Sequence, residues 1–174
     1  GQMRKLVEQM LELARADNVQ YHTALSPVDL SRLVSDAVLP FEPIFFERGL
    51  TLRTKVPEGI TVDGDPAQLR QVLDILLDNA QKYSQERGTT WVTLQRQGKG
   101  HCLLTVADEG AEIPAADLKN LFKRFYRADK ARSRTDSAGR TDCSVESGSF
   151  GLGLSIAETI ITRHRGKIWA ESRN

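Results

Sequence analysis

The sequence predicts an α+β fold: a two-layer sandwich with a mixed, mostly antiparallel sheet, helices on one face of that sheet and one long mobile loop. Two pairs of strand-like segments predict the sheet, residues 50–56 with 60–62 and residues 91–95 with 102–107. Helical apolar spacing between these pairs predicts the second layer. Residues 128–147 predict the loop, because they are rich in Ser, Thr, Asp and Arg and, at about 20 residues without a pattern of their own, exceed ordinary connections.

The composition is that of an ordinary globular domain. At 174 residues the chain is long enough to bury a core, and 40% hydrophobic with 27% charged residues is a common balance in soluble proteins. A formal charge of +1 gives no overall attraction to nucleic acid or to an anionic membrane. Cys102 and Cys143 have no CxxC partner and no His cluster, which argues against a zinc site or a disulfide framework. No apolar run approaches the roughly 20 residues of a transmembrane helix, so we expect a cytoplasmic domain that could belong to a larger membrane protein.

The first third of the chain reads as two helical segments joined by a polar linker. Residues 3–16 place apolar side chains at a/d-like intervals, and a helix of this length is marginal alone, so we expect it to pack on a neighbouring helix or on another copy of itself. Residues 18–27 form the linker. Helical spacing resumes over residues 29–48. Because Pro40 and Pro43 lie inside that pattern, we expect a kink or two shorter helices near residue 40.

A strand pair and the start of a helix come next. Residues 50–56 alternate apolar and polar side chains, residues 57–59 form a turn, and residues 60–62 make a short return strand. Asp65 then offers an N-cap carboxylate, and Pro66 suits the first helical turn. The following helix therefore has a well-defined beginning.

That helix, over residues 69–84, carries the first candidate site. Its apolar residues recur at the three-and-four spacing of one buried face: Leu69, Val72, Leu73, Leu76, Ala80 and Tyr83. Asn79 lies on the edge of this stripe, and a half-buried amide is either hydrogen-bonded locally or reserved for a ligand or ion. Lys82 and Tyr83 follow within one turn, so amide, ammonium and ring could serve a ligand with a metal, phosphates and a flat base. A core helix with an incidental polar flank explains the same residues.

Two later stretches also carry candidate binding groups. Asp108 ends the second strand of the hairpin and precedes a glycine turn, which can present an acceptor at the mouth of a pocket or can be a plain turn. Residues 115–123 predict a short helix. Residues 121–127 interleave aromatic rings with cations, which can pack the rings inward or bind phosphate through Arg124 and Arg127.

The last candidate is a glycine-rich entry to a helix. Residues 148–153 precede a helix that begins near Leu154 and ends at Gly166. Such an entry offers free N–H groups and the positive end of the helix dipole to an anion, although glycines also serve tight packing. Residues 167–171 predict one more strand.

Four of these stretches together resemble the nucleotide-binding domain of sensor histidine kinases, in the superfamily that also holds gyrase, the Hsp90 chaperones and MutL. Residues 76–84, LLDNAQKYS, resemble its asparagine box, and residues 108–114, DEGAEIP, its first glycine box. LFKRFYRAD resembles the phenylalanine box and GSFGLGLSI the final glycine box. Their order and spacing agree with the family, and the resemblance runs from about Val28 to Glu171.

The resemblance implies ATP with Mg²⁺ as the ligand, bound beneath a lid formed by the long mobile loop. Asn79 would ligate the Mg²⁺ that bridges the phosphates, and Tyr83 would lie near the base. Lys82 would meet a phosphate, Arg127 would reach the terminal phosphate, and both would act in catalysis. Asp108 would accept the adenine amino group. The other implied ligand-binding residues form the pocket walls and the phosphate-side turn: Gly110, Ile113, Gly151, Leu152, Gly153 and Leu154.

Two positions depart from the family pattern. Ile75 stands one helical turn before Asn79, where ATP-hydrolysing relatives carry a glutamate base, which disfavours an ATPase of the gyrase or chaperone type. Glu112 occupies the second glycine of the usual DxGxG. A carboxylate about 5 Å from a phosphate could cost about 3 kcal/mol of binding free energy, whereas one that points to solvent would cost little.

The family's phosphate acceptor is a histidine followed by an acidic residue and Leu-Arg, on the first helix of a dimerising hairpin. His22, His101 and His164 do not match this pattern. We therefore expect the acceptor to lie on a separate dimerisation domain. The expected organisation is a remnant of the second hairpin helix, a linker and an ATP-binding catalytic domain without its customary last strand, at residues 1–17, 18–27 and 28–174.

The resemblance thus implies a protein-histidine kinase that transfers the γ-phosphoryl group of ATP to that histidine. Its partners would be the dimerisation domain and a downstream response regulator, with no nucleic acid, in a homodimeric, membrane-anchored bacterial sensor whose catalytic domain is cytoplasmic. The alternative is a degenerate nucleotide-binding or regulatory module with weak or no kinase activity. A serine kinase of the anti-sigma type would share the pocket, but the N-terminal helix argues against it.

Overall fold

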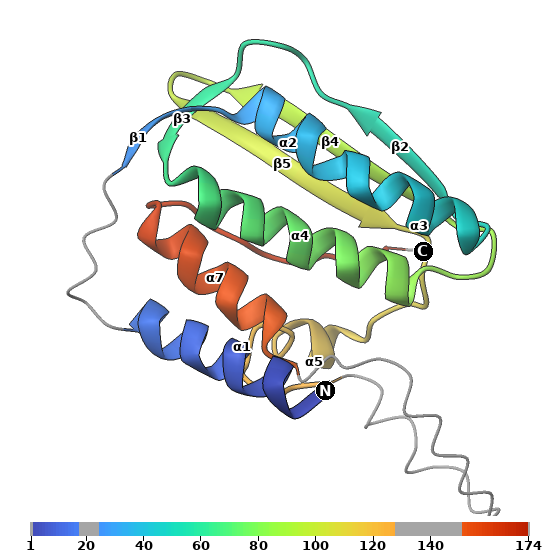
Figure 1. Cartoon of the computed structure of the whole chain (residues 1–174). Helices are drawn as coiled ribbons and strands as arrows, with labels where there is room; N and C mark the ends of the chain where they lie inside the picture. The colour runs from blue at the N-terminus through green and yellow to red at the C-terminus, as the bar shows by residue number, and fades with distance from the viewer. Residues whose placement is uncertain (1, 18–24, 128–150, 174) are drawn as a thin grey trace, which may run out of the picture.

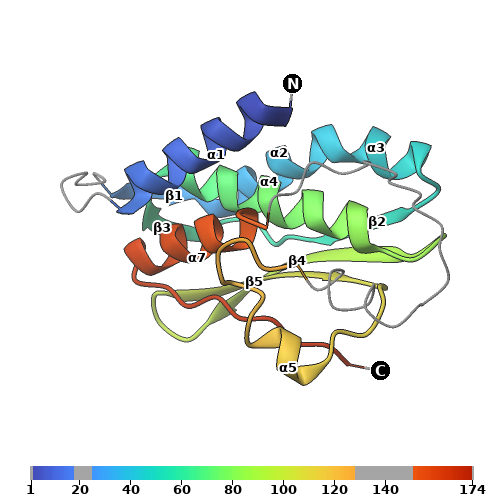
Figure 2. The ribbon, with the colours of Figure 1, turned by 90° about the horizontal axis from the view of Figure 1, so that it is seen from below.

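The structure of the chain is a computed structural model that describes residues 2–17, 25–127 and 151–173. Figures 1 and 2 show two layers. The main sheet forms one layer, and the helices α2, α3, α4 and α7 form the other, on one face of the sheet. The α+β sandwich predicted from the sequence is confirmed. The elements are α1 (Gln2–Asp17), β1 (Ser26–Asp29), α2 (Leu30–Val38), η1 (Leu39–Phe41), α3 (Glu42–Glu47), β2 (Thr51–Lys55), β3 (Thr61–Gly64), α4 (Pro66–Tyr83), β4 (Thr89–Gln97), β5 (His101–Asp108), α5 (Ala115–Leu118) and α7 (Gly153–Arg163).

The main sheet is mixed, as predicted. Its order is β2-β4-β5, with β2 parallel to β4 and β4 antiparallel to β5. The hairpin turns through Gly98 and Gly100, which both have positive φ, and its register sets Thr90 opposite Asp108. Asp108 therefore lies at the open end of the hairpin, directly beside the start of β4.

The predicted return strand is real, but it pairs with a different partner. β3 pairs antiparallel with β1, whose first two residues lie in the segment predicted as linker, and not with β2. The reason lies in the buried Ile60 just before β3. The Ile60 carbonyl accepts a hydrogen bond from Leu30 N–H at 2.9 Å, and the Ser31 hydroxyl accepts one from Ile60 N–H at 3.0 Å. These bonds fix the segment to the start of α2 and direct β3 toward β1.

The helical region over residues 29–48 divides as its prolines predict. Asp29 caps α2 by accepting from Arg32 N–H, and a 3₁₀ turn containing Pro40 separates α2 from α3, in which Pro43 occupies the first turn. Figure 1 shows the two helices following one another along the sheet. Proline lacks the N–H that a continuous helix would need here.

Helix α4 lies at the centre of the molecule. Asp65 caps it by accepting from the N–H groups of Ala67 and Gln68, with Pro66 in the first turn, as predicted. Its buried residues are Val72, Leu73, Leu77, Ala80 and Gln81. The predicted stripe is corrected at one end, because Tyr83 is 45% exposed while Ala80 and Gln81 of the same turn are buried.

Two apolar clusters hold the layers together. The larger one packs α2 and α4 on β4, and the smaller one packs α4 on α7. Leu6 of α1 contacts the smaller cluster, so α1 packs on a neighbouring helix, one of the two predicted partners, and that helix is α7. Met3 and Val7 on other sides of α1 remain exposed.

Two predictions in the last third of the chain are wrong: one strand is absent and one helix is shorter than expected. Residues 167–171 form no strand; Ile168 packs into the smaller cluster and Ser172 Oγ accepts from Ile113 N–H at 3.0 Å, so side-chain contacts fix a segment that has no strand ladder. Figure 2 shows this segment as a coil running from α7 toward α5. The predicted helix over 115–123 ends at Leu118 and continues as turns. The predicted lid over 128–147 lies outside the described residues.

Candidate functional site

One side of α4 connects the motifs that the sequence analysis singled out. Ile75, Asn79 and Tyr83 follow one another at four-residue intervals, so they share one side of the helix over about 12 Å. At the Ile75 end, a Cβ on Gly153 would lie 3.2 Å from the Ile75 Cγ2 atom. At the Tyr83 end, a Cβ on Gly110 would lie 2.8 Å from the Tyr83 carbonyl oxygen. The start of α7 and the turn after β5 therefore meet α4 on either side of the Asn79 turn.

Backbone contacts fix the turn after β5 to the end of α4. Ser84 and Gly110 form an antiparallel bridge, and Gln85 N–H donates to the Glu109 carbonyl at 2.7 Å. A Cβ on Gly110 would also lie 2.7 Å from Asp108 Oδ1, which leaves no space for a side chain. Gly110 is therefore required by the close approach of two chain segments, and it lets Asp108 turn in beside the last turn of α4.

The carboxylate of Asp108 is partly desolvated and lacks a hydrogen-bond donor among the described residues. Desolvation by the surrounding protein raises the pKa of the Asp108 carboxyl group, although the side chain keeps contact with solvent. Within the described residues its carboxylate accepts no side-chain hydrogen bond. A ligand N–H group would supply the missing donor.

Asn79 and Lys82 differ in how far the protein already satisfies them. Asn79 is half-buried, and among the described residues its amide makes no hydrogen bond. Lys82 is only 14% exposed in its side chain and pairs with Asp78, one turn earlier. The amide oxygen of Asn79 is thus available to a metal ion or ligand, while the ammonium of Lys82 already has a partner.

The glycine-rich turn at Gly151 packs closely on the aromatic and basic stretch at residues 121–127. Gly151 has φ +72, and a Cβ there would lie 2.6 Å from the Tyr126 carbonyl oxygen. Phe125 N–H donates to the Gly151 carbonyl at 2.9 Å, and the Tyr126 hydroxyl donates to Asp117, a bond that raises the pKa of Tyr126. The N-cap residue of α7, Leu152, makes no side-chain cap bond. The first N–H groups of α7 are therefore available to donate hydrogen bonds to an anion.

The remaining predicted residues line this region in different ways. Ile113 and Leu154 are half-buried, as pocket walls would be, whereas the Leu152 side chain is fully buried in the smaller cluster and leaves only its backbone for a ligand. The Nε atom of Arg127 is buried and has no hydrogen-bond partner in the described part of the chain. An anion would provide that partner.

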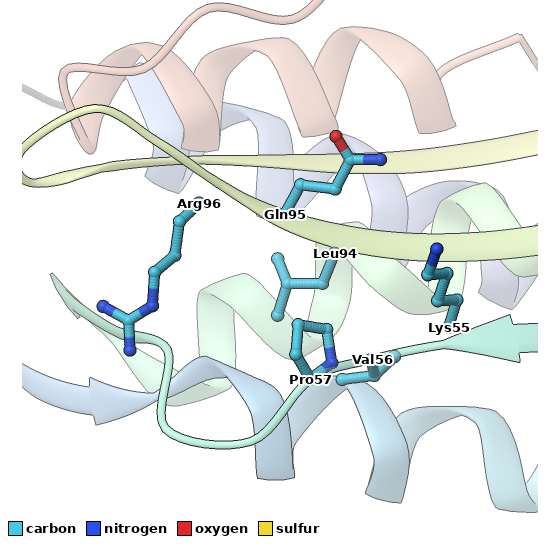
Figure 3. Close-up of a pocket in the computed structure, with 6 residues that line it drawn as sticks. All are labelled: Lys55, Val56, Pro57, Leu94, Gln95 and Arg96. Atoms are coloured by element: carbon cyan, nitrogen blue, oxygen red, sulfur yellow. The ribbon is translucent and has the colours of Figure 1, made fainter.

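A hollow of about 570 Å³ lies elsewhere on the molecule. Figure 3 shows it between the end of β2 with the segment that follows and the last part of β4, with Lys55, Pro57 and Arg96 around it. Gln95 in this hollow is five residues along β4 from Thr90, the partner of Asp108, which is about 17 Å in a strand. The hollow therefore belongs to a different part of the surface.

Comparison with known proteins identifies the class. The family described as histidine kinase-, DNA gyrase B-, and HSP90-like ATPase matches residues 64–174, and the chain belongs to this family. Within it, the relatives are sensor histidine kinases, as the sequence predicted. The chain is 32% identical to the sensor protein DltS of Streptococcus agalactiae over 97% of its own length and 39% of DltS. It is 34% identical to the signal transduction histidine-protein kinase BaeS of Escherichia coli over 98% of its own length and 34% of BaeS.

Solved structures agree with this assignment. The catalytic domain of the histidine kinase ThkA superposes with a TM-score of 0.67 at 25% identity, covering 86% of this chain and 88% of that domain. ThkA has also been solved in complex with the response regulator TrrA, and its fold there matches with a TM-score of 0.74 at 21% identity, over 98% of this chain and 44% of ThkA. The chain thus spans about a third of the curated relatives and nearly all of a kinase catalytic domain. Among its described helices, none combines the length and the apolar character needed to cross a bilayer.

Sequence reasoning missed several residues that support this region. Gln81 is buried in α4 although it is polar, and it joins Arg48 to Asp78 by hydrogen bonds. Glu109 accepts from Thr89 N–H at 2.8 Å and fixes the open end of the hairpin. No signal in the local sequence identifies Arg48 as the partner of Gln81 or Thr89 as the partner of Glu109, because each contact joins elements distant in the chain.

Proposed function

We propose that the chain binds ATP with Mg²⁺ and transfers the γ-phosphoryl group to a histidine on a separate dimerisation domain. The observation that carries the proposal is the meeting of three motifs on one side of α4, with Gly153 against Ile75, Asn79 in the middle and Gly110 beside the last turn. Family membership supports ATP as the nucleotide.

The residues present fit such a ligand. Asp108 offers an acceptor that no donor from the described residues meets, suited to the adenine amino group, and Ile113 and Leu154 offer half-buried apolar walls. Asn79 offers an amide oxygen, a ligand type that Mg²⁺ accepts. The backbone of Gly151 and Gly153 at the start of α7 offers N–H groups to the phosphates. When bound, Mg²⁺ would neutralise phosphate charge during transfer.

Two cations complete the proposed catalytic group. Arg127 has a buried Nε that no group of residues 2–17, 25–127 or 151–173 meets, which favours a role as the cation that reaches the terminal phosphate. Lys82 would meet a phosphate near the Asn79 turn. Phosphoryl transfer requires mainly positioning and charge neutralisation from a protein, and these groups provide both.

Ile75 supports transfer to a protein acceptor over hydrolysis. Its side chain packs toward Gly153 at the position where a general base would activate water. An aliphatic group holds no proton acceptor, so the nucleophile must bring its own, as an imidazole nitrogen does.

The organisation of the whole protein extends the proposal. We assign residues 1–17 to the second helix of the dimerisation hairpin, residues 18–27 to a linker and residues 28–174 to the catalytic domain. The parent protein would be a homodimeric, membrane-anchored bacterial sensor that signals to a response regulator and holds this domain in the cytoplasm.

The direct test mixes the chain with a purified acceptor hairpin from a sensor kinase of this type and with γ-labelled ATP. We expect acid-labile, base-stable label on the hairpin histidine, and none with Asn79→Ala. A chain that binds the Mg²⁺ complex of a non-hydrolysable ATP analogue but never labels any hairpin would contradict the transfer step.

The departure at Glu112 from the family's glycine motivates a second candidate, a degenerate module that regulates through contacts and binds nucleotide weakly or not at all. The Glu112 side chain is exposed and already engaged in an interaction within the protein. Calorimetry with the same analogue separates the two candidates. A sub-millimolar dissociation constant that Asp108→Asn abolishes would exclude the degenerate module.

A further inference from the structure

The carboxylate of Asp78 is shared between two donors on the next turn of α4. Its Oδ2 atom pairs with the Lys82 ammonium, and its Oδ1 atom accepts from the Gln81 amide at 3.0 Å. Three- and four-residue spacing brings all three side chains to the same part of the helix surface. Gln81 thus fixes the Asp78 carboxylate, and that carboxylate in turn fixes the Lys82 ammonium.

Gln81 is itself fixed from a distant element. Its side chain is buried, and the Arg48 guanidinium at the end of α3 donates to its Oε1 atom. Because arginine has only donors, this contact assigns the oxygen of the amide to Arg48 and leaves the NH₂ group for Asp78. A chain of hydrogen bonds therefore runs from α3 through Gln81 and Asp78 to Lys82.

This chain determines where the ammonium lies. The Lys82 side chain is 14% exposed, whereas that of Asp78 is 42% exposed, so the lysine lies back along α4 and does not extend into solvent. Asp78 directly precedes Asn79, and Asn79 and Lys82 are three residues apart on one side of the helix. The ammonium is consequently held at the turn that carries Asn79.

We propose that Asp78 is a positioning residue of the nucleotide site: supported by Gln81, it holds the Lys82 ammonium beside Asn79, ready for a phosphate. The inference rests on the proposed function, since it assigns the phosphates to this turn. A free lysine side chain has four rotatable bonds to order when it binds, and a lysine already ordered by Asp78 avoids most of that loss. The Asp78 carboxylate also repels the phosphates. Ordering of Lys82 strengthens phosphate binding while this repulsion weakens it, so an experiment can separate the two effects.

Calorimetry with the Mg²⁺ complex of a non-hydrolysable ATP analogue provides the first measurement. Asp78→Asn should weaken binding about tenfold, with less than a twofold change for adenosine, which has no phosphates. Asp74→Asn is the matched control, because it breaks the Arg70–Asp74 pair one turn earlier on the same helix. Unchanged or tighter binding by Asp78→Asn, or an equal loss in the control, would overturn the inference.

A double-mutant cycle with Lys82→Met tests whether Asp78 acts through Lys82. In that background, Asp78→Asn should cause no further loss of binding of the analogue, and the removal of the carboxylate charge should tighten binding slightly. Gln81→Leu alone should weaken binding about threefold, since it removes the support but leaves the pair. A full tenfold loss from Asp78→Asn in the Lys82→Met background would show a different route and contradict the inference.

A measurement without nucleotide separates this inference from the proposed function. Acetylation by a soluble ester, followed residue by residue with mass spectrometry, should modify Lys82 at least fivefold more slowly than the exposed Lys55 and Lys99, and Asp78→Asn should remove most of the difference. If Lys82 reacts as fast as Lys55 in the native chain, the positioning is wrong whatever the chain binds. If Lys82 is protected but the native chain binds no nucleotide, the proposed function is wrong and the role of Asp78 is overturned with it.

Discussion

At the scale of single residues, space distinguishes the glycines of the site from those of ordinary turns. Gly98 and Gly151 both have positive φ, but a Cβ on Gly98 would meet nothing within 4 Å, while one on Gly151 would lie 2.6 Å from the Tyr126 carbonyl. Both positions carry the cost of a left-handed conformation for a residue with a side chain. Only Gly151 adds a collision with backbone that cannot rotate away.

We therefore expect Gly151→Ala to lower the free energy of unfolding by about 3 kcal/mol, against about 1 kcal/mol for Gly98→Ala. Urea denaturation followed by circular dichroism measures both. Equal losses for the two variants would mean that the turn before α7 does not pack on the aromatic stretch as the structure shows.

The charged form of Asp108 lowers the stability of the ligand-free protein, because the folded chain partly desolvates the carboxylate. Because desolvation raises its folded-state pKa, protonation is easier in the folded protein than in the unfolded chain. The linkage therefore favours the folded state below the unfolded pKa, and this contribution is lost as the pH rises through the folded pKa.

Asp108→Asn should accordingly raise the melting temperature of the ligand-free protein at pH 7, with a gain that shrinks as the pH falls toward 3. Scanning calorimetry across this range checks the trend. A gain of the same size at pH 3 and pH 7 would show that the carboxylate charge is not its source.

At the scale of elements, His164 links the end of α7 to the start of α4. Its Nδ1–H donates to the Ile160 carbonyl at 2.7 Å, and its Nε2 accepts from Asp65 N–H at 3.0 Å. Asp65 is also the N-cap of α4, so one ring joins two helix ends. His164→Phe should cost about 1 to 3 kcal/mol of stability because it leaves a partly buried donor unpaired.

The control for this change is His101→Ala on the exposed start of β5, which should alter stability by no more than about 0.5 kcal/mol. Thermal denaturation of the two variants side by side gives the comparison. If both histidines prove equally dispensable, the link between α7 and α4 is not formed in solution.

The contact between α1 and α7 gives a second test at this scale. Leu6 packs into the smaller apolar cluster, while Val7 is 49% exposed. Leu6→Ala should cost about 1 kcal/mol and speed amide hydrogen exchange throughout α1, whereas Val7→Ala should leave the exchange unchanged. Exchange in α1 that ignores both substitutions would show a helix that does not dock on the domain.

Helices could be predicted from the sequence more fully than strand partners. Asp65 and Pro66 mark the start of α4, and the prolines at 40 and 43 divide the helical region, because these signals act through bonds within a few residues. The pairing of β3 with β1 depends on Ile60 and Ser31, which are far apart in sequence. Residues 167–171 have the pattern of a strand but no ladder, since pattern alone specifies no partner.

At the scale of the whole molecule, the fold brings short motifs that are separate in sequence together around α4. The end of β5, the aromatic stretch and the start of α7 are separate in sequence, and α4 crosses the centre of the molecule between them (Figure 1). The residue types could be predicted from their motifs, as for Asn79 and Asp108. The support beneath them, from Arg48 through Gln81 to Asp78, could not, because it spans 33 residues and two helices.

The central claim is that Asn79, Asp108 and the turn before α7 bind one and the same nucleotide. A crystal structure of the chain with Mg²⁺ and a non-hydrolysable ATP analogue tests it most directly. The account predicts the adenine amino group at Asp108, the metal at the amide oxygen of Asn79 and phosphates at the first N–H groups of α7. A nucleotide bound in the hollow around Lys55 and Arg96, or Asn79 and Asp108 facing separate spaces, would contradict it.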